Sequence, residues 1–253
     1  MVLRDAFERD GHVVVRGVVP AADIAAFAEV FAAAIPALEY PRGPDGIVRE
    51  LTGIARGYEP MARIAHDPRF GALVAEVLGA ARVQFLQDSL LYKPARDGGS
   101  VEWHQDRTYI GYLVPAQVAT LRIALAPEDE HNGCMRVVDG SHRWGAIGDN
   151  QSLTATSVAS LIPTLSAEQQ ARVADARTLA LEPGDVSIHH CLTLHGSAAN
   201  PSQRPRRTIL LRMFDGACTL DRSKLPPGAE DYFPSDANGH LDAAAFPVVH
   251  ESR

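Results

Sequence analysis

The spacing of apolar residues divides the chain into a helical first part and a later region of short strands. Apolar positions recur three or four residues apart, the period of an amphipathic helix, in four segments: 3–9, 21–35, 59–66 and 68–78. Pro36 is expected to end or kink the second helix, because proline lacks a backbone N–H and clashes with the preceding turn. Gly79, directly after the fourth segment, marks the end of that helix.

Beyond about residue 80 the apolar runs become short and are separated by turn residues. The expected strands are 83–92, 118–126, 135–138, 178–181, 186–190 and 206–214, after one earlier strand at 12–16. A short helix is expected at 166–174, with Ser166 as its N-cap. Helices followed by several short strands are typical of a β-sandwich or β-barrel with a helical N-terminal layer.

Two segments show neither the apolar spacing of a helix nor the short apolar runs of strands. Residues 40–58 are interrupted by prolines and glycines, which predicts a long loop that is either a lid over a site or an ordinary solvated loop. After residue 215, repeated prolines predict an irregular tail that wraps the surface. We therefore expect one domain over 1–253, with a helical part to about residue 80, a β core over 81–215 and the tail.

Composition narrows the class of protein. The 253 residues are 46% hydrophobic, and the net charge of -7 with no block of basic residues argues against a nucleic-acid partner. No apolar run is long enough to span a membrane, and the first residues lack the apolar core of a signal peptide. The odd and sparse set of 3 cysteines predicts free thiols in a reducing compartment, so we expect a cytoplasmic protein. Composition leaves open whether the chain is a monomer or a homodimer.

The stretch Trp103-His104-Gln105-Asp106 holds the first candidate chemistry. On a strand alternate side chains face the same way, so His104 and Asp106 could reach one metal ion. A second histidine would complete a facial triad of two histidines and one carboxylate, which leaves positions on iron open for a co-substrate and O2. An isolated pair of this kind also occurs by chance, in a surface turn after a strand, so its partners decide the interpretation.

His195, which precedes a Gly-Ser pair, is the candidate third ligand. The remaining histidines lack a partner motif; His189 and His190 share a strand, where one would face the core and the other solvent. Arg206 opens the last expected strand, and its guanidinium can clamp a carboxylate with two parallel hydrogen bonds. Thr208 lies on the same face and could donate another. Without the triad, a solvated arginine on an edge strand is the better interpretation.

Taken together, these motifs resemble the phytanoyl-CoA dioxygenase family of Fe(II)- and 2-oxoglutarate-dependent oxygenases. The resemblance covers roughly residues 5–215 and rests on the order and spacing of several short motifs: Trp103-His104-Gln105-Asp106, Asn132-Gly133-Cys134, Asp139-Gly140-Ser141-His142, Pro183-Gly184-Asp185, His195-Gly196-Ser197, Asn200 and Arg206-Arg207. It implies a mainly β fold, the double-stranded β-helix (jelly roll, cupin-like). It also implies His104, Asp106 and His195 as iron ligands, Arg206 as the arm that holds 2-oxoglutarate, and O2 as co-substrate.

The resemblance suggests further residues around these ligands. In ectoine hydroxylase, a relative, a glutamine on the strand before the H-x-D pair lies near the co-substrate, and Gln87 occupies a similar place here. Thr208 is a second candidate for co-substrate binding. Many relatives carry tryptophan where Arg122 stands, so this corner of the pocket departs from the family pattern. A polar substrate pocket could be lined by Arg122 together with Tyr109, Tyr112, Trp144 and Arg56.

The implied function is a dioxygenase that hydroxylates or oxidatively cyclises a small molecule, coupled to decarboxylation of 2-oxoglutarate to succinate and CO2. The carboxylate of Asp106 argues for oxygenation or ring closure, because related halogenases place a small residue there to admit chloride. The short, alanine-rich chain looks similar to tailoring oxygenases of bacterial natural products such as antibiotics. The alternatives are a non-catalytic jelly-roll protein that binds a metal or ligand, and a metal hydrolase, which would have no use for Arg206. Turnover of 2-oxoglutarate to succinate separates all three.

Overall fold

The computed structural model describes residues 2–39, 49–96, 99–148, 160–225 and 227–252. Its larger, antiparallel sheet has the order β1 (His12–Val15), β9 (Val186–His190), β6 (Val118–Ala124), β11 (Arg206–Asp215), β3 (Arg82–Lys93) and β13 (Val248–Glu251), with β2 (Arg49–Thr52) also beside β3. A smaller sheet has the order β4 (Val101–His104), β10 (His195–Ser197), β7 (Arg136–Val137) and β8 (Arg177–Thr178). A separate pair joins β5 (Leu113–Val114) to β12 (Thr219–Leu220).

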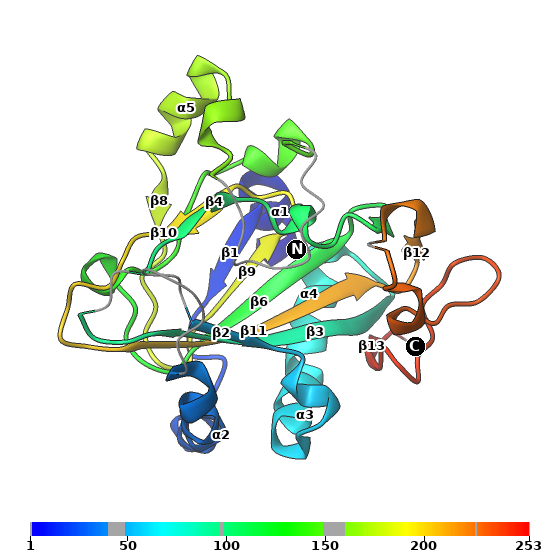
Figure 1. Ribbon diagram of the computed structural model, residues 1–253, viewed down its shortest axis with the longest axis horizontal. Helices are drawn as coiled ribbons and strands as arrows, with labels where there is room; N and C mark the ends of the chain where they lie inside the picture. Colours follow the sequence, from blue (N-terminus) through cyan, green and yellow to red (C-terminus); the bar gives the residue numbers. More distant parts are fainter. Residues whose placement is uncertain (1, 40–48, 97–98, 149–159, 226, 253) are drawn as a thin grey trace.

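Helices cover one face of the larger sheet. They are α1 (Val2–Asp10), α2 (Ala21–Glu39), α3 (Glu59–Ala65) and α4 (Pro68–Leu78). In Figure 1, α2 and α3 lie on one side of the larger sheet, and the smaller sheet with α5 (Ala167–Ala174) lies on the other. Short 3-10 turns connect these elements: η1 (Ile54–Arg56), η2 (Asp106–Thr108), η3 (Glu130–Asn132), η4 (Ser141–Trp144), η6 (Ile162–Thr164), η7 (Arg222–Lys224) and η8 (Glu230–Tyr232).

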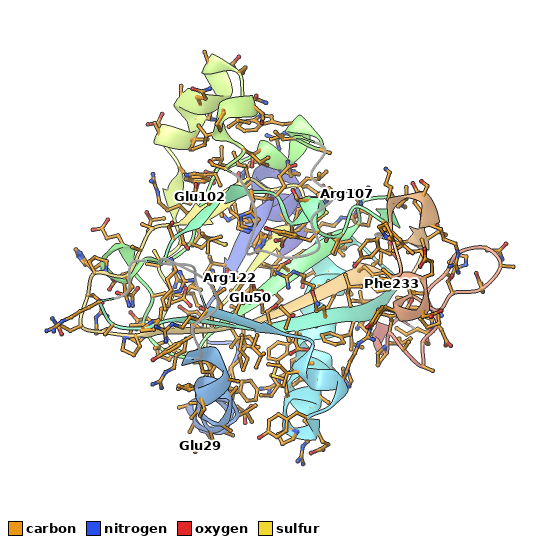
Figure 2. All side chains as sticks on the ribbon, in the orientation of Figure 1. Glu29, Glu50, Glu102, Arg107, Arg122 and Phe233 are labelled. Carbon is orange, nitrogen blue, oxygen red and sulfur yellow. The ribbon has the colours of Figure 1, made fainter. Side chains whose placement is uncertain are left out.

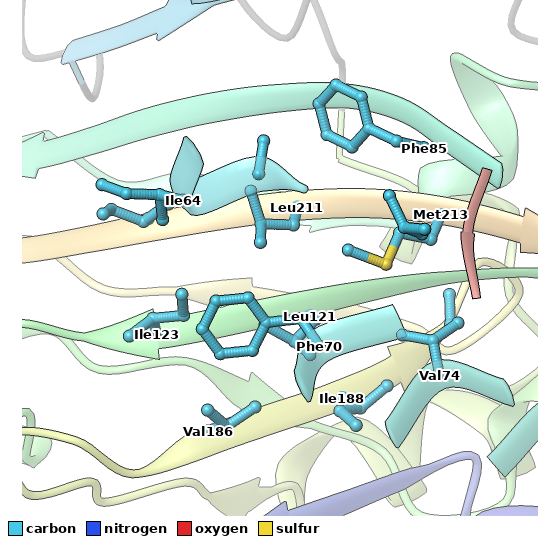
Figure 3. Close-up of a cluster of buried hydrophobic side chains, with 14 of the residues drawn as sticks. Ile64, Phe70, Val74, Phe85, Leu121, Ile123, Val186, Ile188, Leu211 and Met213 are labelled. Carbon is cyan, nitrogen blue, oxygen red and sulfur yellow. The ribbon is translucent and has the colours of Figure 1, made fainter. Parts of the chain in front are cut away.

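The main hydrophobic core fills the space between the helices and the larger sheet. Figure 3 shows Phe70 of α4 packed among Leu121 of β6, Ile188 of β9 and Leu211 of β11. Strand β6 is buried at every position, because helices cover one of its faces and the smaller sheet covers the other. Fully burying one such side chain stabilises the fold by roughly 1.5–3 kcal/mol. The larger sheet is therefore a rigid support for any side chain on its inner face, the face turned towards the smaller sheet.

The helices and strands predicted in the first part and in the β core are present, with bounds shifted by a few residues. Helix α5 begins as predicted, because the Ser166 hydroxyl accepts a hydrogen bond from the Gln169 backbone N–H and the Gln169 side chain accepts one from the Ser166 backbone N–H. Helix α4 ends at Gly79, whose φ of 65° lies in the left-handed region that glycine adopts without strain. The strand expected at 178–181 is shorter than predicted, since only Arg177–Thr178 belongs to β8.

Pro36 does not end the second helix, so the first of the two predicted outcomes, an end or a kink, is wrong. Helix α2 continues through it to Glu39, and the proline ring is exposed to solvent. A proline inside a helix costs one backbone hydrogen bond and about 3 kcal/mol. The helix tolerates this cost because Phe27 and Phe31, between one and three turns before Pro36, anchor it in the core, and little of the helix follows.

Two regions predicted as irregular contain strands. Within the expected 40–58 loop, β2 pairs with β3 from Arg49 opposite Tyr92 to Thr52 opposite Ser89. Residues 40–48, on which the lid interpretation depends, lie outside the described residues. The C-terminal tail does more than wrap the surface: β13 pairs with β3, and Phe246 is buried. Both strands occupy the same free edge of β3, which satisfies backbone groups that would otherwise be exposed.

Candidate active site

Three residues that are far apart in the sequence meet between the two sheets. His104 ends β4, Asp106 opens the turn η2 after it, and His195 begins β10. Strands β4 and β10 are antiparallel neighbours, and their register places His195 opposite His104. One potential ligand atom from each residue lies within 4.8 Å of the other two, and all three residues are buried. The structure thus brings the three residues of the predicted triad close enough together to hold one metal ion.

Backbone carbonyl groups orient both imidazole rings. Nδ1 of His104 lies 2.7 Å from the Glu102 carbonyl oxygen, and Nδ1 of His195 lies 2.9 Å from the Thr193 carbonyl oxygen. A carbonyl oxygen can only accept, so each Nδ1 carries the proton and each Nε2 presents a lone pair. Both Nε2 atoms lie 3.7 Å from Oδ1 of Asp106. This tautomer is the one in which the two histidines can bind a metal ion through Nε2.

The carboxylate of Asp106 is held through its other oxygen. The Thr120 hydroxyl donates a hydrogen bond of 2.5 Å to Oδ2, and Nε2 of His189 lies 3.1 Å from the same atom. Thr120 and His189 sit opposite each other on β6 and β9. Oδ1, which faces the two ligand histidines, is left for a cation. The sequence analysis missed His189, since it belongs to no motif; its contact follows only from the register of β6 and β9.

The protonation states of His195 and Asp106 suit a divalent cation. Burial, helped by the neighbouring imidazole of His104, lowers the pKa of His195 well below its usual range, so the ring is neutral. Burial alone would raise the pKa of Asp106, but the imidazoles of His104 and His189 hold it well below its usual range. Neutral imidazoles and an ionised carboxylate are the forms that bind metal. The residues therefore fit the iron that a facial triad holds.

Two buried basic side chains lie next to each other at one end of the inner face. Arg206 of β11 is paired in register with Lys93 of β3, and each is 1% exposed. Arg206 donates to the Gly133 carbonyl oxygen, while its Nε has no partner among the described residues. Burial and the nearby Arg206 lower the pKa of Lys93 to about 6. Lys93, which the sequence analysis did not select, donates from Nζ to the Ser197 hydroxyl at 2.7 Å. The pair offers a place for an anion.

Glu128 organises the polar groups around these basic side chains. It accepts a hydrogen bond of 2.6 Å from the Thr208 hydroxyl and one of 2.8 Å from Nη2 of Arg122. Arg122 also donates to the Ser187 hydroxyl at 3.1 Å and is 2% exposed. Arg122 thus has protein partners for its charge, a placement that does not favour the predicted contact with substrate. The Thr208 hydroxyl is likewise engaged with protein rather than unpaired.

One cross-strand row links the metal site to a third buried arginine. Arg212 of β11 lies opposite Gln87 of β3 on one side and opposite Thr120 of β6 on the other, and Thr120 lies opposite His189. Residues opposite each other in an antiparallel sheet point to the same face. Gln87 is therefore on the inner face near the metal site, and its side chain is exposed there. The register of β3 and β11 shifts beside this row, between Arg212 and Met213.

Arg212 has few partners for a buried charge. Nη1 donates to the Ser89 hydroxyl at 2.9 Å, and Nη2 lies 3.8 Å from Oε1 of Glu50, too far for a hydrogen bond. Glu50 comes from β2 and appears near the middle of the fold in Figure 2. Burial would lower the pKa of Arg212, but the carboxylates of Asp106 and Glu50 raise it. Arg212 and Glu50 are two charged groups beside the triad that the sequence analysis did not select.

The remaining predicted substrate residues fall in different places. The ring of Tyr109 lies 5.8 Å from that of His104, and Tyr112 packs 4.6 Å from Phe233, between ring centroids. Arg56 lies over the Phe246 ring at 5.2 Å, and Phe246 stacks on Phe233. Tyr109 therefore lies beside the triad, while Tyr112 and Arg56 are connected through the stacked rings of Phe233 and Phe246. Trp144 instead packs on the apolar cluster of Val138, Leu161, Leu165, Val173 and Leu194.

Comparison with known proteins places the chain among iron oxygenases. The model of the family "Phytanoyl-CoA dioxygenase (PhyH)" matches residues 7–208. The chain belongs to the phytanoyl-CoA dioxygenase family. Ectoine dioxygenase of Sphingopyxis alaskensis is 30% identical to the chain in an alignment 234 positions long, which covers 81% of this chain and 72% of that protein. The predicted resemblance is confirmed, and the chain is a non-haem Fe(II)- and 2-oxoglutarate-dependent dioxygenase.

Solved structures confirm the predicted jelly-roll fold. The epimerase SnoN, in complex with Fe3+, alpha ketoglutarate and nogalamycin RO, matches with a TM-score of 0.79 over 98% of both chains, at 22% identity. The carbocyclase SnoK from nogalamycin biosynthesis matches with a TM-score of 0.78 over 98% of this chain and 95% of its own, at 21% identity. Among the described residues, no helix is long and apolar enough to cross a membrane.

Proposed function

We propose that this dioxygenase oxidises a small polar molecule at a site between its two sheets. His104, Asp106 and His195 would hold Fe(II), which together with 2-oxoglutarate and O2 supplies the oxidising chemistry and yields succinate and CO2. Arg206 and Lys93 would bind the distal carboxylate of 2-oxoglutarate. The observation that carries this proposal is the convergence of two lone-pair Nε2 atoms and one free carboxylate oxygen within 4.8 Å.

The pair of buried basic side chains supports the place of the co-substrate. Strand register and hydrogen bonds bring three basic residues together with one acidic residue, Glu128. The basic residues are Lys93, Arg206 and Arg122. A dianion would offset the excess positive charge, and the open Nε of Arg206 offers it a donor. We expect Thr208 to act through Glu128, which fixes the surrounding groups. Gln87 faces the Arg212 side of the triad, so its predicted place near the co-substrate stays a prediction.

The other side of the triad supports a polar substrate. Arg212 and Glu50 lie there with incompletely used hydrogen-bonding groups, and Tyr109 and Tyr112 present aromatic faces beside them. Burial raises the pKa of both phenols, so each hydroxyl stays protonated and can donate to a substrate. A wholly apolar substrate would leave the two charges unsatisfied, which costs free energy.

We further propose that the reaction is a hydroxylation or an oxidative ring closure. The enzyme would be cytoplasmic and act in bacterial secondary metabolism, such as antibiotic biosynthesis. The epimerase and carbocyclase from nogalamycin biosynthesis, which share the fold along nearly the whole chain, support this pathway class. A homodimer is compatible with it. A non-catalytic jelly-roll protein is not favoured, because pure binding requires neither the complete triad nor the pair of buried basic side chains.

An anaerobic titration tests the proposal. Apo protein is titrated with Fe(II) and then with 2-oxoglutarate, while the visible charge-transfer band of the chelate is followed. We expect the band in the natural protein and in Arg207→Ala, whose side chain points away from Arg206 on the same strand, and its loss at moderate 2-oxoglutarate concentration in Arg206→Ala. Admission of O2 should then release succinate. A protein that forms no band, or that binds both ligands without ever releasing succinate, would contradict the proposal.

A further inference from the structure

Within the described residues, hydrogen bonds from the protein reach one oxygen of the Asp106 carboxylate and not the other. Oδ2 accepts from the Thr120 hydroxyl at 2.5 Å and from Nε2 of His189 at 3.1 Å. Oδ1 accepts no hydrogen bond from the described residues and faces His104 and His195, each at 3.7 Å. The two oxygens of one carboxylate therefore have different environments, and these environments are set by side chains outside the triad.

The donors to Oδ2 come from two buried, paired positions within the larger sheet. Thr120 and His189 are 0% and 1% exposed, and they face each other in the paired strands β6 and β9 at the centre of the larger sheet. A hydrogen bond from a hydroxyl to an ionised carboxylate is among the stronger ones, and 2.5 Å is typical of it. Rotation of the carboxylate about its Cβ–Cγ bond would break both bonds at once. The orientation of Asp106 is thus fixed by the sheet itself.

His189 has no other polar partner within the described part of the chain. Its Nδ1 is buried and forms no hydrogen bond there. A neutral imidazole with its proton on Nε2, the form that donates to Asp106, leaves this buried Nδ1 lone pair unsatisfied, which is unfavourable. An aromatic hydrocarbon ring of similar size would avoid that cost. The presence of histidine at this position is explained by the hydrogen bond to Oδ2 rather than by packing.

We propose that Thr120 and His189 are positioning residues that make Asp106 a one-oxygen ligand. This inference rests on the proposed function, in which the triad holds Fe(II). A carboxylate free to rotate could present both oxygens and occupy an additional position on the metal. Holding Oδ2 in hydrogen bonds reserves the remaining positions of the facial triad for 2-oxoglutarate and O2. Residues that orient a metal ligand in this way affect metal affinity by about 10–100-fold.

Substitutions that keep volume and remove one donor test the proposal. Thr120→Val and His189→Phe are compared with the natural protein by anaerobic Fe(II) titration and by the visible spectrum of the Co(II)-loaded protein, which reports the number of ligands. We expect a loss of metal affinity of about 10–100-fold in each variant, an altered Co(II) spectrum and a weaker 2-oxoglutarate band at saturating Fe(II). Thr120→Ser, which keeps the hydroxyl, should restore most of the affinity.

Ser187→Ala is the matched control. Ser187 is a fully buried hydroxyl on β9, two residues from His189, and its side chain contacts Arg122 instead of Asp106. Its loss should leave the metal affinity and the Co(II) spectrum unchanged. Equal losses in Ser187→Ala and Thr120→Val, or unchanged affinity and spectrum in both Thr120→Val and His189→Phe, would overturn the inference and leave the proposed function intact. A natural protein that binds no Fe(II) would overturn both.

Discussion

His195 faces His104 across the β4–β10 pair, with their ring centroids 4.2 Å apart and both Nε2 atoms 3.7 Å from Oδ1 of Asp106. Two histidines this close, aimed at one carboxylate oxygen, leave a space that a cation fills favourably. Since each ring is fixed by a backbone carbonyl, the arrangement does not depend on the metal for its geometry.

Removal of one ligand should abolish turnover without unfolding the protein. We expect His104→Ala to reduce succinate formation to background and to remove Fe(II) binding, because two ligands hold the metal far more weakly than three. His131→Ala, an exposed histidine away from the site, is the control and should behave like the natural protein. Succinate formation by His104→Ala at a near-natural rate would remove this residue from the ligand set. Circular dichroism establishes that both variants are folded.

Loss of the Arg206 guanidinium should weaken 2-oxoglutarate binding more than metal binding. A hydrogen bond to a charged group contributes about 1.5–3 kcal/mol, so the dissociation constant of 2-oxoglutarate in Arg206→Ala should rise about 10–100-fold. Titration of Fe(II) alone should give an affinity near that of the natural protein. An unchanged affinity for 2-oxoglutarate would show that residues other than Arg206 bind the co-substrate.

The affinity for 2-oxoglutarate should fall as the pH rises above about 6. Burial and Arg206 lower the pKa of Lys93 to about 6, so this lysine is largely neutral in the empty site at neutral pH. An anion favours the charged form, so the pKa of Lys93 rises in the complex and binding takes up a proton. The contribution of charged Lys93 to 2-oxoglutarate binding is fully present below the pKa that Lys93 has in the empty site. It is lost as the pH rises above the pKa of Lys93 in the complex.

Calorimetry between pH 6 and 9 measures this effect. Titrations of 2-oxoglutarate into the Fe(II)-loaded protein, in two buffers of different ionisation enthalpy, give the number of protons taken up. We expect uptake of up to one proton in the natural protein and less in Lys93→Met, whose affinity should be lower and less dependent on pH. Equal proton uptake by the two proteins would show that Lys93 does not hold the anion.

Arg212 and Glu50 should control the use of substrate more than the use of co-substrate. Once a substrate is identified by succinate release, Arg212→Met should raise its KM and increase the ratio of succinate to oxidised product, because the substrate is no longer held beside the metal. Glu50→Gln should have a smaller effect of the same kind, since Glu50 is more than hydrogen-bonding distance from Arg212. Product formation that stays fully coupled to succinate in Arg212→Met would place the substrate elsewhere.

The helical layer should contribute strongly to stability. Phe70→Ala removes a fully buried ring from the main core, and we expect it to lower the free energy of unfolding by about 3–5 kcal/mol. Tyr232→Ala, at a side chain that is 66% exposed, should change it by less than about 0.5 kcal/mol. Urea denaturation followed by fluorescence and circular dichroism measures both. A small effect of Phe70→Ala would mean that the sheets are stable without the helices.

The site residues that could be predicted from the sequence are those that belong to short local motifs. His104 and Asp106 share a strand end, and His195 and Arg206 belong to recognisable short patterns. His189 and Lys93 were missed because each is an ordinary strand residue whose partner is fixed by register with a strand distant in sequence. The alternation of apolar residues predicts which face of a strand a side chain lies on. It does not predict which residue of the neighbouring strand lies opposite.

The misplaced elements have a similar cause. Strand β2 lies in a stretch rich in glycine and charge, where local propensity favours a loop, and it forms because the edge of β3 is available for pairing. Glu50 reaches the site through this pairing, so no local pattern selects it. The ion pair of Arg122 with Glu128 was not predicted either, and the contact of Arg122 with a substrate stays a prediction.

Strand β11 begins at Arg206 and carries Arg212 six residues later on the same face. At about 3.3 Å per residue, their backbones are separated by roughly 20 Å. In the proposed function Arg206 binds the co-substrate and Arg212 the substrate, so the strand would set the spacing between these two binding groups. A change of substrate would then require changes around Arg212 and leave Arg206 in place. A single inserted residue between them would instead turn one of the two arginines to the opposite face.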